Sequence, residues 1–213
     1  MKKIDMDKWE RKEIYEFFSG ISDPFYMVSF IVDVTELKAF TKRHGCSFYY
    51  SLIWLCNKAM SRVENFRYVC RDDGVYLIDE RVPSFTDRKE DSELFHIVTV
   101  PADGDILSFC RSASETSRKQ KCFIEPSLEG GHLAYYSCLP TLRLTALTNE
   151  FDLLAPGFAS DSVPRIAWGR YTEHGGRLEL TVSMELNHRF IDGVHIEKFA
   201  SCLEELIAGL TGE

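Results

Sequence analysis

The stretch RLELTVSMELNHRFIDG, residues 177–193, decides how this chain can fold. Apolar side chains alternate with polar or small ones from position 178 to position 186, which is the pattern of a β-strand with one covered face. His188 continues the apolar parity, so a strand that extends this far points its imidazole into the covered side of the sheet. An ionisable ring is costly there unless it is held for a purpose.

The rest of the chain indicates one α+β domain, residues 1–213. A length of 213 residues can bury a substantial core, and no linker rich in Pro, Gly or Ser divides it. With no apolar run long enough to cross a bilayer and a charged N-terminus, we expect a cytoplasmic protein with no membrane partner. The net charge of −8 and the scattered basic residues argue against a nucleic-acid partner.

The seven cysteines are separated by ten residues or more and include no CxxC pair. This spacing fits neither a disulfide framework nor a zinc knuckle, so we expect reduced, mostly buried thiols.

Local signals predict an order of elements. A capping pattern from Asp33 to Glu36 and a stop at Gly45 bound one helix, and Ser47 caps a second helix over 48–62. An Asp-Gly pair between 66–70 and 75–78 predicts a hairpin. The later expectations are a strand at 93–100, a helix over 105–120, strands at 132–137 and 142–147 separated by Pro140, an irregular segment at 149–164, a closing hairpin of 165–172 with the 177–186 strand, and a helix over 194–210.

His188 at a strand end, followed by Asp192 and Gly193, suggests a base held on rigid elements. A neutral imidazole can take a proton from an alcohol or a thiol near pH 7. Gly193 would let the chain turn tightly into the helix, and Asp192 could orient the histidine or bind an arginine.

Three other readings of His188 remain open on residue types alone. It could be a satisfied core histidine, a metal ligand together with Asp192 and His195, or the base of a Ser-His-Asp hydrolase. The metal reading is weak because the three residues span a turn and no other segment is rich in ligands, so we predict no metal. The hydrolase reading lacks a GxSxG elbow.

Several blocks of sequence, taken in order, resemble one family. The segment NHRFIDGVH at 187–195 is similar to the HHxxxDG signature of the chloramphenicol acetyltransferases and to the DHRxxDG signature of the acyltransferase cores of 2-oxo-acid dehydrogenase complexes. The resemblance to the acetyltransferases covers essentially the whole chain. The further blocks are WERKE at 9–13, FY at 48–49, the hairpin at 65–75, SCLP at 137–140 and WGRY at 168–171, which resemble the family's WxRKE, FYP, FRMAxKDGxLV, SAxPW and MGKY segments.

This resemblance implies a fold, a reaction and an assembly. The fold would be a two-layer α/β sandwich of the chloramphenicol acetyltransferase type, with a mixed sheet and packed helices. The reaction would be direct acetyl transfer from acetyl-CoA, a co-substrate, to a hydroxyl of a small acceptor, with no tightly bound cofactor. The assembly would be a homotrimer with active sites between subunits, and antibiotic resistance is the role that the family suggests.

The resemblance also implies roles for single residues. His188 would be the general base, with its own backbone carbonyl holding its tautomer, and Ser137 would donate a hydrogen bond to the oxyanion of the tetrahedral intermediate. Arg11 and Asp192 would form an ion pair that braces the turn carrying His188.

The departures from the family fall on the acceptor side. Asn187 replaces the first histidine of the signature, Phe18 a tyrosine of the antibiotic pocket, Ala167 a threonine, and Thr141 a tryptophan. Loss of such polar groups can change the acceptor, so acetyl transfer is predicted more firmly than chloramphenicol as its acceptor. The alternative is a non-catalytic protein that binds CoA or a small molecule on the same scaffold. A dehydrogenase-complex acyltransferase is disfavoured because the chain has no lipoyl domain or flexible linker.

Overall fold

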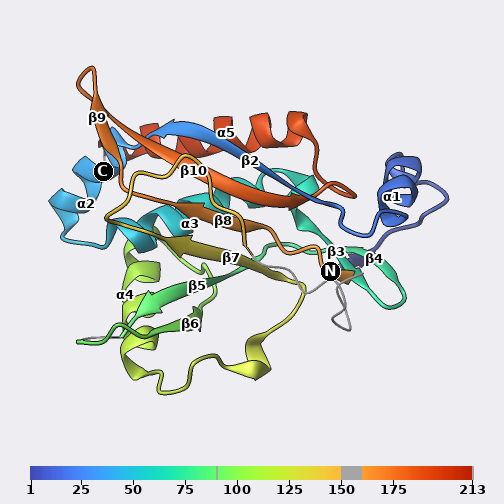
Figure 1. Cartoon of the computed structure of the whole chain (residues 1–213), viewed down its shortest axis with the longest axis horizontal. Coiled ribbons are helices and arrows are strands. Elements are labelled where there is room, and N and C mark those ends of the chain that lie inside the picture. The colour runs from blue at the N-terminus through green and yellow to red at the C-terminus, as the bar shows by residue number, and fades with distance from the viewer. Residues whose placement is uncertain (90, 150–159, 213) are drawn as a thin grey trace.

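The computed structural model describes residues 1–89, 91–149 and 160–212, and it is a mixed α/β structure (Figure 1). Its main sheet has the order β2-β10-β8-β7-β5-β6, with β9 paired to β10. The pairs β5–β7 and β7–β8 are parallel and the others antiparallel, so the sheet is mixed as expected. Its strands are β2 (Phe25–Asp33), β5 (Val82–Arg88), β6 (Phe95–Thr99), β7 (Leu133–Cys138), β8 (Arg165–Trp168), β9 (Thr172–His174) and β10 (Arg177–Asn187).

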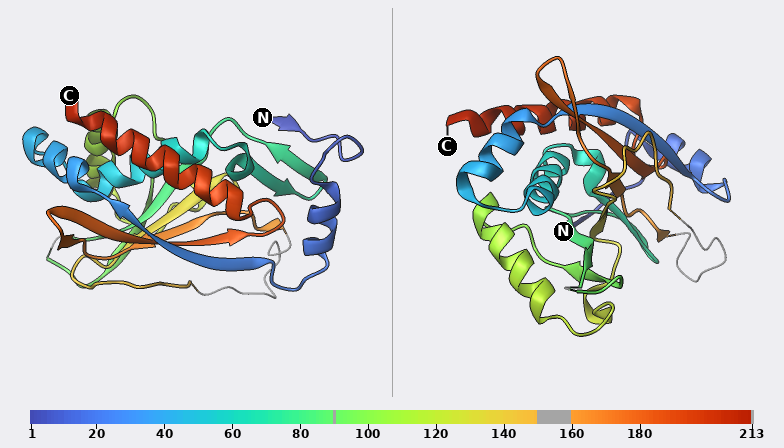
Figure 2. Two further views of the ribbon diagram at one scale, coloured as in Figure 1. Left: turned by 90° about the horizontal axis from the view of Figure 1, so that it is seen from above. Right: turned by 60° about the vertical axis from the view of Figure 1, so that its left-hand side comes forward.

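Helices pack on one face of this sheet, as the left view of Figure 2 shows. A small separate sheet of β1 (Lys2–Lys3), β4 (Gly74–Leu77) and β3 (Tyr68–Arg71) lies at the end of the molecule near α1. None of the helices in the described residues combines the length and the apolar character that crossing a membrane requires. The helices are α1 (Lys12–Ser19), α2 (Thr35–His44), α3 (Phe48–Ser61), α4 (Ile106–Lys119) and α5 (Gly193–Ala208), with short 3₁₀ turns at Glu64–Arg67, Pro126–Leu128 and Gly209–Gly212.

The two faces of the main sheet differ in chemistry. The face under α3 and α5 carries the core, and its side chains alternate along each strand with those of the other face. Core side chains on the helix-covered face include Phe85, Tyr136, Ile166, Trp168, Val182, Met184 and Leu186. The strand registers place Thr86, Ser137, Arg165, Ala167, Ser183, Glu185 and Asn187 on the opposite, helix-free face.

Most predicted elements are confirmed within a few residues. Gly45 ends α2 with a left-handed φ of 61°, the Ser47 side chain accepts from the Tyr50 N–H at the start of α3, and Asp105 does the same for Ser108 in α4. The hairpin at 66–78, the strand at 93–100 and the closing hairpin are present as β3–β4, β6 and β8–β9–β10. The capping box at Asp33 is replaced by a simpler contact, in which Asp33 accepts from both the N–H and the hydroxyl of Thr35.

Two expectations differ from the structure. Residues 142–147 form no strand, because their backbone groups pair with a side chain and a turn: the Leu147 N–H and carbonyl both bond to the Ser183 hydroxyl, and the Leu142 carbonyl accepts from the Arg170 N–H. The elements β1, α1, β2 and β5 were not predicted from the sequence. The irregular segment expected at 149–164 falls largely outside the described residues.

Candidate active site

His188 lies directly after the last residue of β10. The strand ends at Asn187, so the side chain does not enter the core as its parity suggested: 34% of it is exposed. The ring stacks on Phe18, with centroids 4.2 Å apart, and contacts Tyr26 at 4.4 Å. Its Nδ1 is buried and has no hydrogen-bond partner among the described residues, so the exposed part of the side chain lies elsewhere on it. A core histidine would lack this exposure.

Arg11 holds the turn that follows His188. Its guanidinium pairs with both oxygens of Asp192 at 2.6 and 2.7 Å, and it also donates to the carbonyls of Arg189 and His188. Both partners are largely buried, and this bidentate bond is the first reason that the pKa of Asp192 is lowered. The expected brace is therefore present, and it joins residues 181 positions apart.

The Asp192 carboxylate also approaches the histidine. Its Oδ1 lies 3.3 Å from His188 Nδ1, while the His188 carbonyl, which was expected to hold the tautomer, accepts from Arg11. One carboxylate thus touches both the arginine and the imidazole. Tyr26 completes this shell, since its hydroxyl donates to the Ile191 carbonyl and burial raises its pKa to about 12.

His195 has a structural contact in this turn. Its Nδ1 accepts a hydrogen bond of 2.9 Å from the Asp192 N–H at the start of α5, which requires an unprotonated nitrogen. Burial, and then the charge of Arg11, lower the pKa of His195. Because Asp192 is already bound by Arg11, His188, Asp192 and His195 do not form a metal site. Nowhere in the described residues do three His, Cys, Asp or Glu side chains gather as ligands for an ion.

Asn187 and Gly193 flank the turn in different ways. Asn187 is 2% exposed; its amide oxygen accepts from the N–H and Nε of Arg189, and its nitrogen donates to the Asp161 carbonyl. Gly193 has no left-handed φ, and a Cβ added there would contact nothing within 4 Å. The expectation that the turn needs the freedom of glycine is therefore wrong for the backbone of this chain.

Ser137 lies near the end of β7, on the helix-free face. Its hydroxyl is 3.2 Å from that of Thr86 on β5, and it lines a cavity of about 490 Å³. The wall combines aromatic and aliphatic side chains with a few polar groups, which is the mixture typical of a small-molecule site. The lining includes Thr86, Phe95, Phe123, Glu129, Tyr135 and Arg165.

His188 and Ser137 are far apart within one chain. Ser137 is in register with Ala167 and Ala167 with Ser183, so His188 lies five residues farther along the sheet and two strands away. With standard strand dimensions the two Cα atoms are roughly 19 Å apart. No hydroxyl can contact both side chains at once in a single copy.

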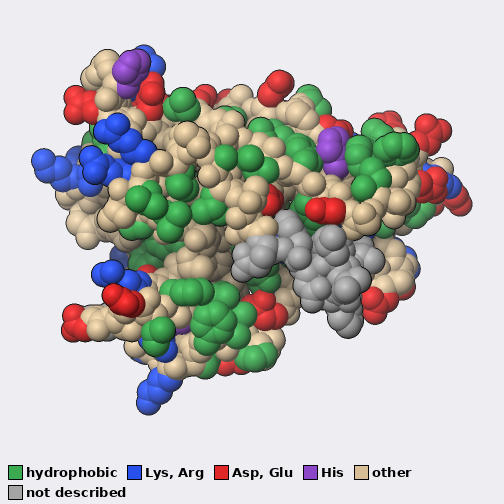
Figure 3. Space-filling view, in the orientation of Figure 1, with side chains coloured by type: hydrophobic (Ala, Val, Ile, Leu, Met, Phe, Trp, Pro, Cys, Tyr) green, Lys and Arg blue, Asp and Glu red, His purple; other side chains and the backbone are tan. Residues whose placement is uncertain are grey.

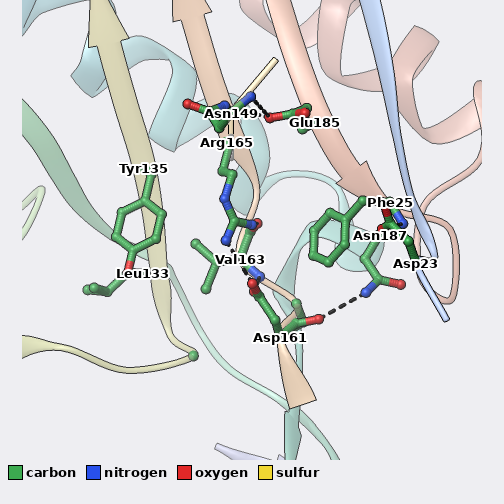
Figure 4. Close-up of polar contacts among 12 residues, drawn as sticks. Asp23, Phe25, Leu133, Tyr135, Asn149, Asp161, Val163, Arg165, Glu185 and Asn187 are labelled. Carbon is green, nitrogen blue, oxygen red and sulfur yellow. Dashed lines mark hydrogen bonds and ion pairs between the residues drawn. The ribbon is translucent and has the colours of Figure 1, made fainter. Parts of the chain in front are cut away.

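The two candidate acceptor residues have different surroundings. Phe18 covers one face of the His188 ring, whereas Ala167 is 3% exposed beside Ser137 and Ser183 and lines no cavity described here. No sequence pattern marks Glu129, Arg165, Tyr26 or Thr86, because their positions in the site depend on contacts between distant segments. Figure 4 shows Arg165 between the rings of Tyr135 and Phe25.

A second hollow also reaches the end of β7. This cleft of about 800 Å³ is lined by Cys138, the residue after Ser137, by Ser47 and Phe48 at the start of α3, and by loop residues beyond β8. Two arginines, Arg143 and Arg170, line it and are exposed. Its wall therefore offers positive charge and the N-terminus of a long helix, both of which favour anionic groups.

Comparisons with known proteins agree with this arrangement. The family model described as chloramphenicol acetyltransferase matches residues 1–204. Chloramphenicol acetyltransferase 3 of Escherichia coli is 26% identical over 208 residues, covering 96% of this chain and 95% of that protein. A chloramphenicol acetyltransferase of Streptomyces acrimycini is 28% identical over 214 residues, covering 96% and 93%.

Solved structures share the fold. A chloramphenicol acetyltransferase superposes with a TM-score of 0.85 at 24% identity, covering 97% of this chain and all of the other. The dihydrolipoamide acetyltransferase of Azotobacter vinelandii superposes with a TM-score of 0.69 at 18% identity, covering 91% and 85%.

The family match over residues 1–204 and the curated relatives identify a CoA-dependent acetyltransferase. Within that class, the chain belongs to the chloramphenicol acetyltransferase family. The expected α/β fold is thereby confirmed, and acetyl-CoA is the co-substrate that the family uses.

Proposed function

We propose that this protein transfers the acetyl group of acetyl-CoA directly to a hydroxyl of a small acceptor, in a homotrimer whose sites combine His188 of one copy with Ser137 of the next. The single observation that carries the proposal is the separation of these residues. His188 is partly exposed on a turn held by Arg11, and Ser137 lines a cavity, yet the two Cα atoms are roughly 19 Å apart in one chain.

The helix-free face supports the assembly. Met27 and Ile31 of β2 lie on this side of the sheet and are 39% and 58% exposed, which is costly for an isolated copy. Figure 3 shows groups of hydrophobic side chains over this side of the molecule. A second copy docked here would cover them and bring its His188 toward the Ser137 cavity.

The proposed chemistry needs no covalent enzyme intermediate. His188 Nε2 takes the proton of the acceptor hydroxyl as its oxygen attacks the thioester carbonyl. The Ser137 hydroxyl donates to the oxyanion that forms, a contact typically worth about 10²–10³ in turnover. When the C–S bond breaks, the imidazolium returns its proton to the leaving thiolate, and the products are an acetyl ester and free CoA.

The cleft beside Cys138 is the proposed route for CoA. Its two arginines and the N-terminus of α3 suit the phosphate groups of the carrier. The rings of Phe48 and Tyr171 lie 5.5 Å apart in the wall, and Lys38 approaches the Tyr171 ring at 5.7 Å. Because Cys138 follows Ser137, a thioester at the inner end of this cleft reaches the serine side of the site.

The test is thiol release from acetyl-CoA with chloramphenicol and a panel of small alcohols. Replacement of His188 by Ala is expected to lower kcat by about 10²–10⁴ with any accepted alcohol, and Ser137→Ala by about 10²–10³. The matched control is His174→Ala, because His174 is an exposed histidine whose side chain is 81% accessible.

An active His188→Ala protein would contradict the assigned base. Calorimetry separates the remaining possibilities: binding of CoA or an alcohol without turnover of any alcohol in the panel would favour the non-catalytic alternative instead.

A further inference from the structure

One wall of the Ser137 cavity carries a carboxylate without a counter-ion. Glu129, which follows the 3₁₀ turn at Pro126–Leu128, accepts a hydrogen bond of 2.9 Å at Oε2 from the Tyr135 hydroxyl. Its Oε1 is buried and has no hydrogen-bond partner among the described residues. A buried carboxylate oxygen left unpaired is costly, which indicates that the cavity is completed by a donor that is not among the described residues.

The neighbouring cation does not neutralise Glu129. Arg165 lines the same cavity, but its guanidinium pairs with Asp161 at 2.7 Å and donates to the Val163 carbonyl. Figure 4 shows this pair, with the Arg165 guanidinium between the rings of Tyr135 and Phe25. His132 is within reach of the Glu129 charge, yet burial and then two arginines lower its pKa, so it is neutral near pH 7. Glu129 is therefore the unbalanced charge of the cavity wall.

The other walls suit a cation. Phe95 and Phe123 form an edge-to-face pair with ring centroids 5.4 Å apart, and both line the cavity with Tyr135. Aromatic faces and a carboxylate together are the usual surroundings of a bound ammonium group. The Tyr135 hydroxyl stays protonated, since burial and the Glu129 contact raise its pKa, and so it keeps donating to Oε2.

We infer that the acceptor of this enzyme is an amino alcohol, whose ammonium group binds Glu129 while its hydroxyl lies at Ser137. The inference rests on the proposed function and names its substrate class. Tyr135 and Ser137 lie on the same face of β7, two residues and so about 7 Å apart along the strand. A separation of about 7 Å between the hydroxyl and the ammonium group corresponds to a benzene ring with a methylene group at each para position.

Three probes of one shape and different charge test this inference. They are 4-(aminomethyl)benzyl alcohol, 1,4-benzenedimethanol and 4-(hydroxymethyl)benzoate, which are cationic, neutral and anionic at pH 7. Binding of each to the full-length protein with CoA is measured by calorimetry, and acetylation by thiol release. The cation is expected to bind at least about tenfold more tightly than the neutral probe, and the anion more weakly than either.

The variant that isolates the charge is Glu129→Gln. The amide keeps the shape of the side chain and removes its charge, so the preference for the cation should shrink to within about twofold. The matched control is Glu125→Gln, at an exposed glutamate four residues away that does not line the cavity, and it should keep the wild-type preference.

The outcomes separate this inference from the proposed function. Wild-type protein without a preference for the cation, or without measurable binding of it at millimolar concentration, overturns the inference, and so does a preference that survives Glu129→Gln. If the neutral alcohol is acetylated and no charge preference exists, the function stands and the inference fails. If the predicted charge order appears in binding but no probe is acetylated, the cation site at Glu129 stands and the proposed acetyl transfer is wrong.

Discussion

At the scale of single residues, the site depends on one guanidinium that fixes three backbone or carboxylate groups at once. Arg11 reaches the carboxylate of Asp192 and the carbonyls of His188 and Arg189. A planar fork can make these contacts together, whereas a lysine ammonium offers one point charge. The position of the turn that carries His188 therefore depends on this guanidinium.

Replacement of Arg11 by Lys tests this dependence. The lost bidentate bond and the carbonyls left without donors should lower the free energy of unfolding by about 1–3 kcal/mol, measured by urea denaturation. The kcat of acetyl transfer should fall more than the KM for acetyl-CoA changes, since the base moves while the cleft is untouched. Lys12→Ala, which removes an exposed ion pair with Asp7, should change neither quantity noticeably, and equal effects of the two substitutions would contradict the argument.

His195 gives the turn a pH dependence. Burial lowers its folded-state pKa below the ordinary histidine value of 6.5. The stability that His195 contributes is therefore present above pH 6.5 and is lost as the pH falls from there toward the lowered pKa. His195→Asn can still accept the Asp192 N–H without titrating. Urea midpoints measured from pH 5 to pH 8 should therefore fall less steeply toward acid in the variant. Parallel curves would show that His195 does not titrate on unfolding.

Site residues in or near a recognisable sequence motif could be predicted from the sequence. Site residues that meet only through long-range tertiary contacts could not. His188 and Asp192 stand in the signature segment itself, and the family resemblance implied the contact of Arg11 with Asp192. Glu129 gives no such signal: its importance comes from Tyr135, six positions away, and from a cavity assembled by β5, β6, β7 and β8. The stacking of Phe18 on His188 likewise joins positions 170 residues apart, which no local pattern contains.

At the scale of elements, the periodicity of the sequence predicted helices and strands with a local signal. It missed strands that are defined by their pairing with a distant segment. N-cap residues mark the starts of the helices α3 and α4, and the alternation of apolar and polar residues marks β10. The strand β2 is a long apolar run without clear alternation, and only its register with β10 makes it a strand. Residues 142–147 look like a strand, but Leu147 bonds the Ser183 hydroxyl and Leu142 accepts from the Arg170 N–H, so these residues form no strand.

Two glycines near these elements should respond oppositely to alanine. Gly193 begins α5 with space around it, so Gly193→Ala should leave stability unchanged or raise it by up to about 1 kcal/mol through helix propensity. At Gly169, after β8, an added Cβ would overlap the Leu142 carbonyl and lie 2.8 Å from Leu144 Cγ, so Gly169→Ala should be destabilising by at least about 1 kcal/mol. Thermal unfolding of both variants checks this pair, and a destabilised Gly193→Ala would reveal a contact made only between copies.

At the scale of the whole molecule, helices cover one face of the main sheet and leave the other face free. The covered face carries the core, whereas the helix-free face carries Ser137, Tyr135 and exposed side chains of β2. The candidate base stands at one end of β10 and the candidate oxyanion donor at the far end of β7. Closed rotational symmetry is the simplest way in which identical copies can bring such complementary ends together.

This arrangement predicts that two inactive variants restore one another. In a trimer with shared sites, a His188→Ala copy still supplies Ser137, and a Ser137→Ala copy still supplies His188. If the two proteins are denatured, mixed in equal amounts and refolded together, random assembly makes about one quarter of the sites intact. Thiol release should then return to about one quarter of the wild-type rate, although each variant refolded alone stays inactive. A mixture as inactive as its components, with mixed trimers verified by mass spectrometry, would mean that both groups act within one chain or that one of them does not act at all.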